Sequence, residues 1–256
     1  MQREKIKNLL TQGKSEQKVT ICGWIKTKRV SKNFAFVVIN DGSCQQDIQC
    51  IVDSNTPAFP KLDNLLTGAS VKLTGVLKAS PGKGQAWEIH TSDIEIFGTS
   101  DDTYPLQKKG HTLEYLREIS QFRSRTNTLS AVFRIRNVIS FAIHEFFQSR
   151  GFIWVHTPII TGNDCEGAGE LFHVTNFNPA TIAKKGYDAK ADFFGKPAFL
   201  TVSGQLQGEI FAMSHGEIYT FGPTFRAENS NTSRHLAEFW MVEPEVAFND
   251  LKDNMQ

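Results

Sequence analysis

Cysteine is scarce in this 256-residue chain, which has four: Cys22, Cys44, Cys50 and Cys165. No two form a Cys-x-x-Cys pair, and their spacing indicates neither a disulfide framework nor a zinc site. No apolar run approaches the roughly 18 residues of a membrane helix. The charged segment 1–10 lacks the apolar core of a signal peptide. We therefore expect a cytoplasmic protein with reduced thiols and no membrane partner.

The chain also lacks a strong net charge, because its 28 Lys and Arg residues are nearly balanced by 27 Asp and Glu residues. The formal net charge is +1. The apolar fraction of 40% and the charged fraction of 21% are those of an ordinary globular protein. The segment 17–40, however, carries five cations and no acid. Such a basic face could bind nucleic acid, although a merely solvated face is the plainer alternative.

The first hundred residues are rich in strand signals. We expect strands over 19–30, 34–40, 47–52, 70–78 and 87–97, and a short helix over 59–66. Five strands with a helix between the third and fourth is the order of an OB-fold barrel. The sequence therefore predicts an all-β OB-fold domain over 1–98, followed by a hinge or linker over 99–125. The stretch 98–110 carries the Gly, Thr, Ser, Asp, Pro and Lys residues typical of a linker.

The rest of the chain mixes helices with strands. Apolar residues follow the helical period over 127–150, and Gly151 is placed to end that helix. We expect strands at 152–158 and 199–203, a helix at 205–213, and a closing hairpin. The pattern predicts an α+β domain over 126–256, built on an antiparallel sheet with helices.

The hairpin contains the most informative motif of the chain: Arg226, Glu228, Arg234, His235 and Phe239. Arginine suits bidentate contact with phosphate and stays charged when desolvated. Glu228 shares a strand face with Arg226, and Phe239 offers a π-face for a purine. A salt-bridged hairpin with a core phenylalanine is the alternative, but the whole set at this spacing favours a nucleoside triphosphate site.

The segment 225–239 resembles motif 2 of the class II aminoacyl-tRNA synthetases, and 150–158 resembles their motif 1. An OB-fold ahead of both is similar to the aspartate-like subgroup, and 203–206 with 221–230 most resemble its asparaginyl members. The resemblance implies an asparagine–tRNA ligase that uses ATP with Mg²⁺ and acts on tRNA(Asn). It also implies a homodimer with Pro158 of motif 1 in the interface.

The resemblance implies nucleotide roles for the hairpin residues. Arg226 would contact the α-phosphate of ATP and the amino-acid carboxylate, stabilising charge as the adenylate forms. Glu228 would face the adenine or the acceptor end of tRNA. Arg234 and His235 would hold the γ-phosphate, and Phe239 would stack on adenine.

The resemblance also implies an amino-acid pocket. Glu166 and Glu243 would meet the substrate ammonium, and Ser203 and Gln205 would line the pocket. For Glu166 alone, a solvated loop acid is the plainer interpretation. Gly208 stands where aspartyl enzymes carry a lysine for the substrate carboxylate. A pocket without that cation would leave the carboxylate unpaired, which favours asparagine.

On the barrel, the resemblance implies an anticodon site. Phe36 would stack on the central anticodon base, Gln49 would read a base, and Lys28 and Arg29 would contact the backbone or nearby bases. The alternative is that Phe36, with Phe34, belongs to the barrel core.

The chain departs from the family pattern in lacking its third motif. The carboxylates expected to hold Mg²⁺ would lie beyond Gln256, so we expect this chain alone not to complete adenylation. We also expect an exposed sheet edge and an uncovered apolar face. The alternatives are an aspartyl enzyme of relaxed specificity, a non-catalytic tRNA-binding module, or an asparagine-forming paralogue. The segment 178–196 is an insertion of unassigned role.

Overall fold

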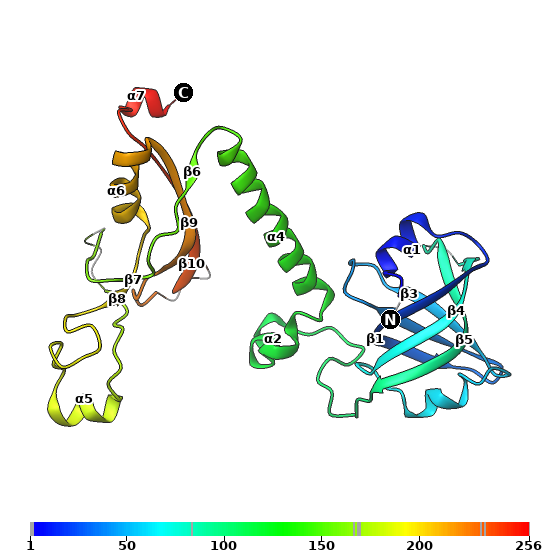
Figure 1. Ribbon diagram of the computed structural model, residues 1–256. Coiled ribbons are helices and arrows are strands. Elements are labelled where there is room, and N and C mark those ends of the chain that lie inside the picture. The colour runs from blue at the N-terminus through cyan, green and yellow to red at the C-terminus, as the bar shows by residue number, and fades with distance from the viewer. Residues whose placement is uncertain are drawn as a thin grey trace. The chain divides into compact units, whose positions relative to one another are not determined.

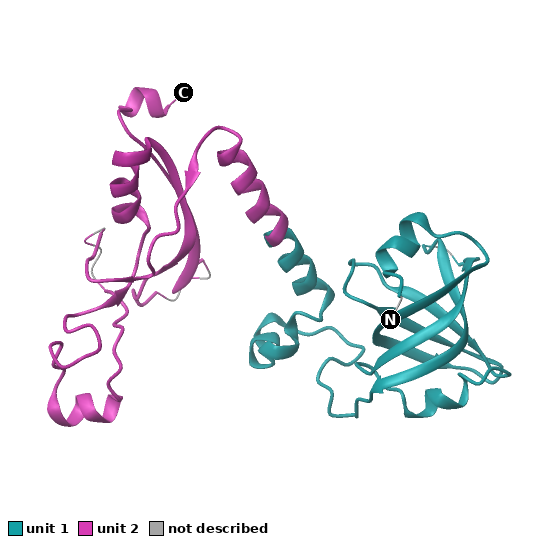
Figure 2. Cartoon of the chain, in the orientation of Figure 1, with its two compact units in different colours: residues 1–136 teal, residues 137–256 magenta. Residues whose placement is uncertain are grey.

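The chain folds into two compact units, residues 1–136 and 137–256, shown in Figure 2. The computed structural model describes residues 3–82, 84–165, 167, 170–230, 232 and 234–255. Within this described part, no helix is both long and apolar enough to span a bilayer.

Unit 1 is built on a closed five-stranded barrel (Figure 1). Its strands are β1 (Gln17–Val30), β2 (Phe34–Asn40), β3 (Ile48–Asp53), β4 (Ser70–Ala79) and β5 (Trp87–Gly98). They close in the order β1-β2-β3-β5-β4, with β3 and β5 parallel and the other pairs antiparallel. The 3-10 helix η1 (Pro60–Asn64) lies between β3 and β4 in sequence, so the predicted OB-fold order is confirmed.

Alternate side chains along the strands point inward and fill the barrel interior. On β2, Ala35, Val37 and Ile39 are fully buried, whereas the intervening residues face outward. Helix α1 (Ile6–Gln12) adds Ile6 and Leu9 to the same core. This helix was not predicted, because seven residues with two buried apolar anchors make a weak periodic signal.

The segment 99–125, predicted as a hinge or linker, contains regular structure. It contains α2 (Leu113–Glu118), which is capped by the Thr112 hydroxyl, and α3 (Ser120–Arg123). The Tyr104 ring lies directly over Gly68, where a Cβ would come within 2.8 Å of it. Gly68 also has φ of +93°, so both the packing and the backbone require glycine there.

Helix α4 (Asn127–Gln148) ends as predicted at Gly151, which has φ of +91°. The Gly151 N–H donates to the Gln148 carbonyl (3.1 Å) and the Phe152 N–H to the Phe147 carbonyl (3.2 Å), which is a Schellman motif. In unit 2, the Phe147 ring stacks on Tyr219 with centroids 4.6 Å apart.

The main sheet of unit 2 has three strands in the order β10-β9-β6. They are β6 (Ile153–Trp154), β9 (Glu217–Phe225) and β10 (Glu238–Val246). The prediction of an antiparallel sheet holds for β9 and β10 but is wrong for β6, which pairs with β9 in parallel. The strand expected over 152–158 is also shorter: after the Val155 N–H bonds to the Tyr219 carbonyl (2.9 Å), the chain leaves β9 toward Pro158.

A second, two-stranded sheet pairs β7 (Ile160–Thr161) with β8 (Phe199–Leu200). The strand expected over 199–203 ends early because the Thr201 hydroxyl accepts the Ser203 N–H (3.3 Å) and turns the chain. The residues described in this unit also form α5 (Pro179–Lys185), α6 (Gln205–His215) and α7 (Leu251–Asn254). The helix α6 was predicted, whereas α5 was not.

Candidate active site

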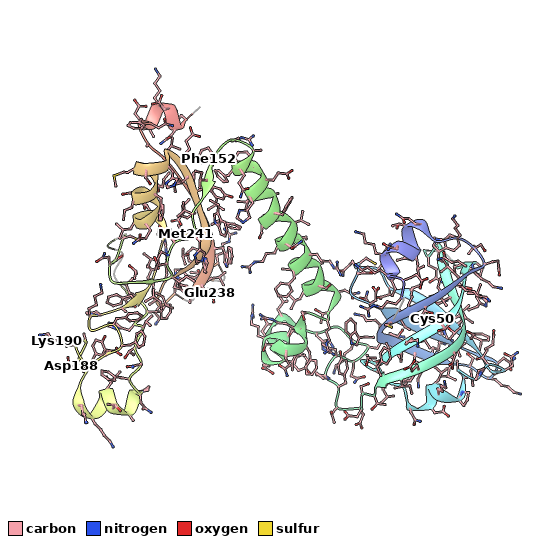
Figure 3. The ribbon with its side chains drawn as sticks, viewed as in Figure 1. Cys50, Phe152, Asp188, Lys190, Glu238 and Met241 are labelled. Atoms are coloured by element: carbon pink, nitrogen blue, oxygen red, sulfur yellow. The ribbon has the colours of Figure 1, made fainter. Side chains whose placement is uncertain are left out.

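The β9–β10 hairpin separates two kinds of side chain onto its two faces. Register places Thr220, Gly222 and Thr224 of β9 opposite Glu243, Met241 and Phe239 of β10. The face that these residues share packs against α6, and we call it the α6 face. The opposite face is aromatic, with Tyr219 and Phe221 beside His144 of α4. Figure 3 marks Met241 and Glu238 on β10.

Arg226 and Phe239 come together at one end of the α6 face. The Arg226 N–H donates to the Ala237 carbonyl (3.0 Å), which continues the hairpin pairing one residue beyond the strands. The Arg226 guanidinium carbon lies 5.4 Å from the centroid of the Phe239 ring. A cation and an aromatic face are thereby held side by side, as the sequence motif requires for a nucleotide.

Glu228 and His235 meet across the loop of the hairpin. The His235 Nε2 atom lies 3.4 Å from a Glu228 carboxylate oxygen. Arg234 is exposed beside them. The loop thus brings one of the predicted phosphate-side residues, His235, against an acid.

Glu243 is the centre of a hydrogen-bond network on the α6 face. Its carboxylate accepts the Ser203 hydroxyl, the Gly204 N–H (3.0 Å) and the Thr220 hydroxyl (2.9 Å). The Ser203 oxygen in turn accepts the Gln205 N–H (3.0 Å). Three of about four acceptor positions of the carboxylate are therefore filled by the protein itself. Glu243 fixes the start of α6 to the hairpin, a role that the sequence did not reveal, although the hairpin register already places Thr220 opposite it.

The two other predicted pocket residues lie on α6. Gln205 is exposed, and its amide donates to Glu209 (3.0 Å) one turn along the helix. Gly208 is buried, and a Cβ there would lie 3.4 Å from the Glu245 Cγ and from the Thr220 Cγ2. Burial raises the pKa of Glu245, and the nearby Glu209 and Glu243 raise it further. A side chain at position 208 would therefore enter an acidic environment.

The loop expected to cover the amino acid is described only in part. Glu166, predicted to meet the substrate ammonium, lies outside the described residues. The cavity beside Glu243 and Gly204 has a volume of about 20 Å³, room for about one water molecule. Thr157, which follows β6, also lines it. Pro158 is exposed.

The predicted anticodon residues lie mostly on one outer face of the barrel. Phe36 pairs in register with Arg29 on β1 and with Ile51 on β3, and Gln49 pairs with Val38. Phe36 is half-buried against Phe34, at a centroid distance of 5.1 Å. The alternative that Phe36 is barrel core is wrong, because alternation directs Ala35 and Val37 inward instead.

Lys28 does not join this face. It pairs with the inward-facing Val37, and its ammonium donates to the Leu62 carbonyl of η1 (2.5 Å). Burial lowers the pKa of Lys28, although Asp63 partly offsets the effect. Lys28 therefore connects β1 to η1, whereas Arg29 is exposed.

A larger cavity, of about 750 Å³, lies in unit 1 between the barrel and the segment 99–130. Trp24 and Tyr104 line it, together with Lys26, Lys109 and Arg125. The Lys26 ammonium donates to the Arg125 carbonyl (3.0 Å), which joins the two walls. Sequence motifs gave no sign of this cavity, because its residues come from segments far apart in the chain.

Two family models match the chain. The model of tRNA synthetases class II (D, K and N) matches residues 113–256, more than half of the chain, and that of the OB-fold nucleic acid binding domain matches residues 19–97. The chain belongs to the class II tRNA synthetase family (D, K and N). The resemblance found in the sequence is confirmed at the level of family and fold.

Curated relatives in this family match nearly all of the chain. The asparagine–tRNA ligase of Nostoc sp. is 54% identical over 260 residues, covering 100% of this chain and 56% of the relative. That of Pelobacter propionicus is 55% identical over 251 residues, covering 97% of this chain and 55% of the relative. The chain therefore spans just over half the length of these relatives.

Two solved structures of asparaginyl-tRNA synthetases are similar in fold to this chain. Asparaginyl-tRNA synthetase from Pyrococcus horikoshii, complexed with asparaginyl-adenylate, superposes with a TM-score of 0.85 at 26% identity, covering 100% of this chain and 55% of that one. The asparaginyl-tRNA synthetase of Entamoeba histolytica gives 0.77 at 25% identity, covering 95% and 53%. The two-part architecture of this chain thus corresponds to just over half of each of these larger structures.

Proposed function

We propose that this chain is part of an asparagine–tRNA ligase. The observation that carries the proposal is the α6 face, where Arg226 lies against Phe239 and the Glu243 network holds the start of α6. The asparagine–tRNA ligases of Nostoc and Pelobacter, identical at more than half of the aligned positions, support the same substrate. In the reaction, the asparagine carboxylate attacks the α-phosphate of ATP to give asparaginyl-adenylate and pyrophosphate. A terminal ribose hydroxyl of tRNA(Asn) then displaces AMP.

The residues of this chain would contribute charge and position. The Arg226 guanidinium would stabilise the negative charge that develops at the α-phosphate, in the manner of a preorganised electrostatic site. Phe239 would present its ring to adenine, while Arg234 and His235 would reach the γ-phosphate. Glu228 would lie toward the adenine or the tRNA end.

Magnesium would accompany ATP and neutralise its phosphates. Among the described residues, no group of three or more His, Cys, Asp or Glu side chains fits a metal ion. No step above depends on such a site.

The whole protein would act as a homodimer in the cytoplasm. The exposure of Pro158 and of apolar residues on α4, such as Val138 and Phe141, supports an interface on this side of unit 2. Sedimentation of the full-length protein would test the dimer. A monomer at micromolar concentration would contradict it.

Selectivity for asparagine over aspartate would depend on Gly208. Position 208 faces Glu245, which itself lies within electrostatic reach of Glu209 and Glu243, so the environment of this glycine is acidic. A substrate carboxylate would meet negative charge there, whereas a neutral amide would not be repelled. A lysine at this position would place a positive charge there, which would favour a substrate carboxylate.

Amino-acid-dependent ATP–pyrophosphate exchange tests both proposals. The full-length protein is assayed with asparagine and with aspartate, and Gly208→Lys is assayed alongside. Exchange with asparagine alone supports the ligase, and a shift toward aspartate in the variant supports the role of Gly208. Exchange with aspartate alone would support the aspartyl alternative. No exchange with either would favour a tRNA-binding module.

A further inference from the structure

The insertion over 178–196 is a folded arm. Asn178 caps α5 by accepting the Ala180 N–H (2.8 Å), and Gly186 ends the helix with φ of +81°. Asp192, only 8% exposed, accepts the N–H groups of Asn176 (3.1 Å) and Phe193 (2.8 Å). A hydrogen bond from the Thr175 hydroxyl lowers the pKa of Asp192. The arm is therefore an ordered part of unit 2.

The base of the arm is bonded directly to the hairpin that carries Arg226. The two sides of the base pair through the Val174 N–H and the Ala198 carbonyl (2.8 Å). The Phe225 N–H donates to the Thr201 carbonyl (2.8 Å), and the Ala227 N–H to the Glu170 carbonyl (3.2 Å). Both neighbours of Arg226 are thus anchored to the segments that enter and leave the arm. In Figure 1, α5 and α7 lie at opposite ends of this unit.

The surface of the arm combines positive charge with exposed aromatic rings. Four lysines against two aspartates give 178–196 a formal charge of +2, while the whole chain has only +1. Lys184, Lys185 and Lys190 are exposed, and Figure 3 shows Lys190 at the edge of the arm. Phe193 is 74% exposed and Phe194 43%, with their rings 4.8 Å apart.

We propose that the 178–196 arm binds the acceptor arm of tRNA. Its lysines would contact phosphates, and Phe193 with Phe194 would stack on unpaired bases near the acceptor end. This inference rests on the proposed function and assigns a further binding surface to it. The acceptor arm is favoured over other parts of the tRNA because the arm is anchored beside Arg226, where the transfer to the terminal ribose would occur.

The test uses the full-length protein and two RNA probes: an acceptor-stem minihelix with a single-stranded end, and an anticodon stem-loop. The variants are Lys184→Glu with Lys185→Glu, and separately Phe193→Ala. Lys7→Glu with Lys14→Glu reverses two exposed lysines in unit 1 and serves as the control. Affinity is measured by fluorescence anisotropy at two salt concentrations, beside asparagine-dependent ATP–pyrophosphate exchange.

Each arm variant should weaken minihelix binding roughly ten-fold, with exchange and stem-loop affinity unchanged. In the lysine variant, the affinity should also depend less steeply on salt concentration, by the amount expected for the loss of about one to two phosphate contacts. Unchanged minihelix affinity with normal exchange would overturn the arm proposal alone. Altered sedimentation of the arm variants would also overturn it, because the surface would then cover another protein chain. If the parent shows no exchange but binds the minihelix through these lysines, the ligase proposal fails and the arm proposal stands.

Discussion

The barrel and the hairpin sheet place their candidate residues in opposite relations to the core. In the barrel, Phe36 and Arg29 stand outside an interior that is closed without them. In unit 2, by contrast, Glu243 of the α6 face and its neighbours Ser203 and Gly208 are themselves part of the packing between α6 and the hairpin. Binding and stability are therefore separable in unit 1 and coupled in unit 2.

The largest effect should come from emptying the barrel interior. Leu73 is fully buried, so Leu73→Ala should lower the free energy of unfolding by about 2–5 kcal/mol through lost burial and a cavity. Ile139→Ala on α4, where the side chain is 54% exposed in this chain, is the matched aliphatic control and should cost much less. Urea unfolding followed by circular dichroism measures both. Equal losses would contradict the contrast between a closed core and an open helix face.

Glu243→Gln should couple stability to activity. The amide keeps one acceptor but places an NH₂ group among the donors of Ser203, Gly204 and Thr220. We expect a loss of about 1–3 kcal/mol in the stability of unit 2, together with weaker asparagine-dependent exchange. Thermal unfolding and exchange assays on the full-length protein report the two effects. A fall in exchange at unchanged stability would mean that Glu243 acts only on the substrate.

Phe36→Ala should separate the two properties in the barrel. In the full-length protein, loss of stacking should weaken tRNA(Asn) binding roughly ten-fold, while amino-acid activation stays intact. Stability should fall by no more than about 1 kcal/mol, because the lost ring contacts are mainly with Phe34 on the outer face. Phe97→Ala, an exposed aromatic of β5, is the control. Joint loss of binding and activation would indicate a folding defect instead.

The smallest effect should be a change in pH dependence at Glu245. Its folded-state pKa is raised by burial, so the folded chain binds this proton more tightly than the unfolded chain. The contribution to stability is therefore greatest below the ordinary value of 4.5 and declines as the pH rises through the raised folded value. Glu245→Gln has no such proton to lose, so its stability relative to the parent should increase as the pH rises through the folded pKa of Glu245. Unfolding across pH measures this, with the exposed Glu238→Gln as the control, and parallel curves for parent and Glu245→Gln would refute it.

Local patterns in the sequence determined the barrel order, the helix ending at Gly151, the hairpin and the family motifs. Alternation, turn residues and spacing act over a few neighbours, so they can be read without coordinates. Even the outward direction of Phe36 follows from alternation once the buried side of β2 is known.

Only the tertiary structure decided which residues from distant segments meet. Glu243 reaches Ser203 across 40 positions, and the Lys28 ammonium reaches the Leu62 carbonyl across 34. The parallel pairing of β6 with β9 and the anchoring of the 178–196 arm beside Arg226 depend likewise on contacts between remote segments. Such contacts are set by packing and by the need to pair buried polar groups, which no local pattern encodes.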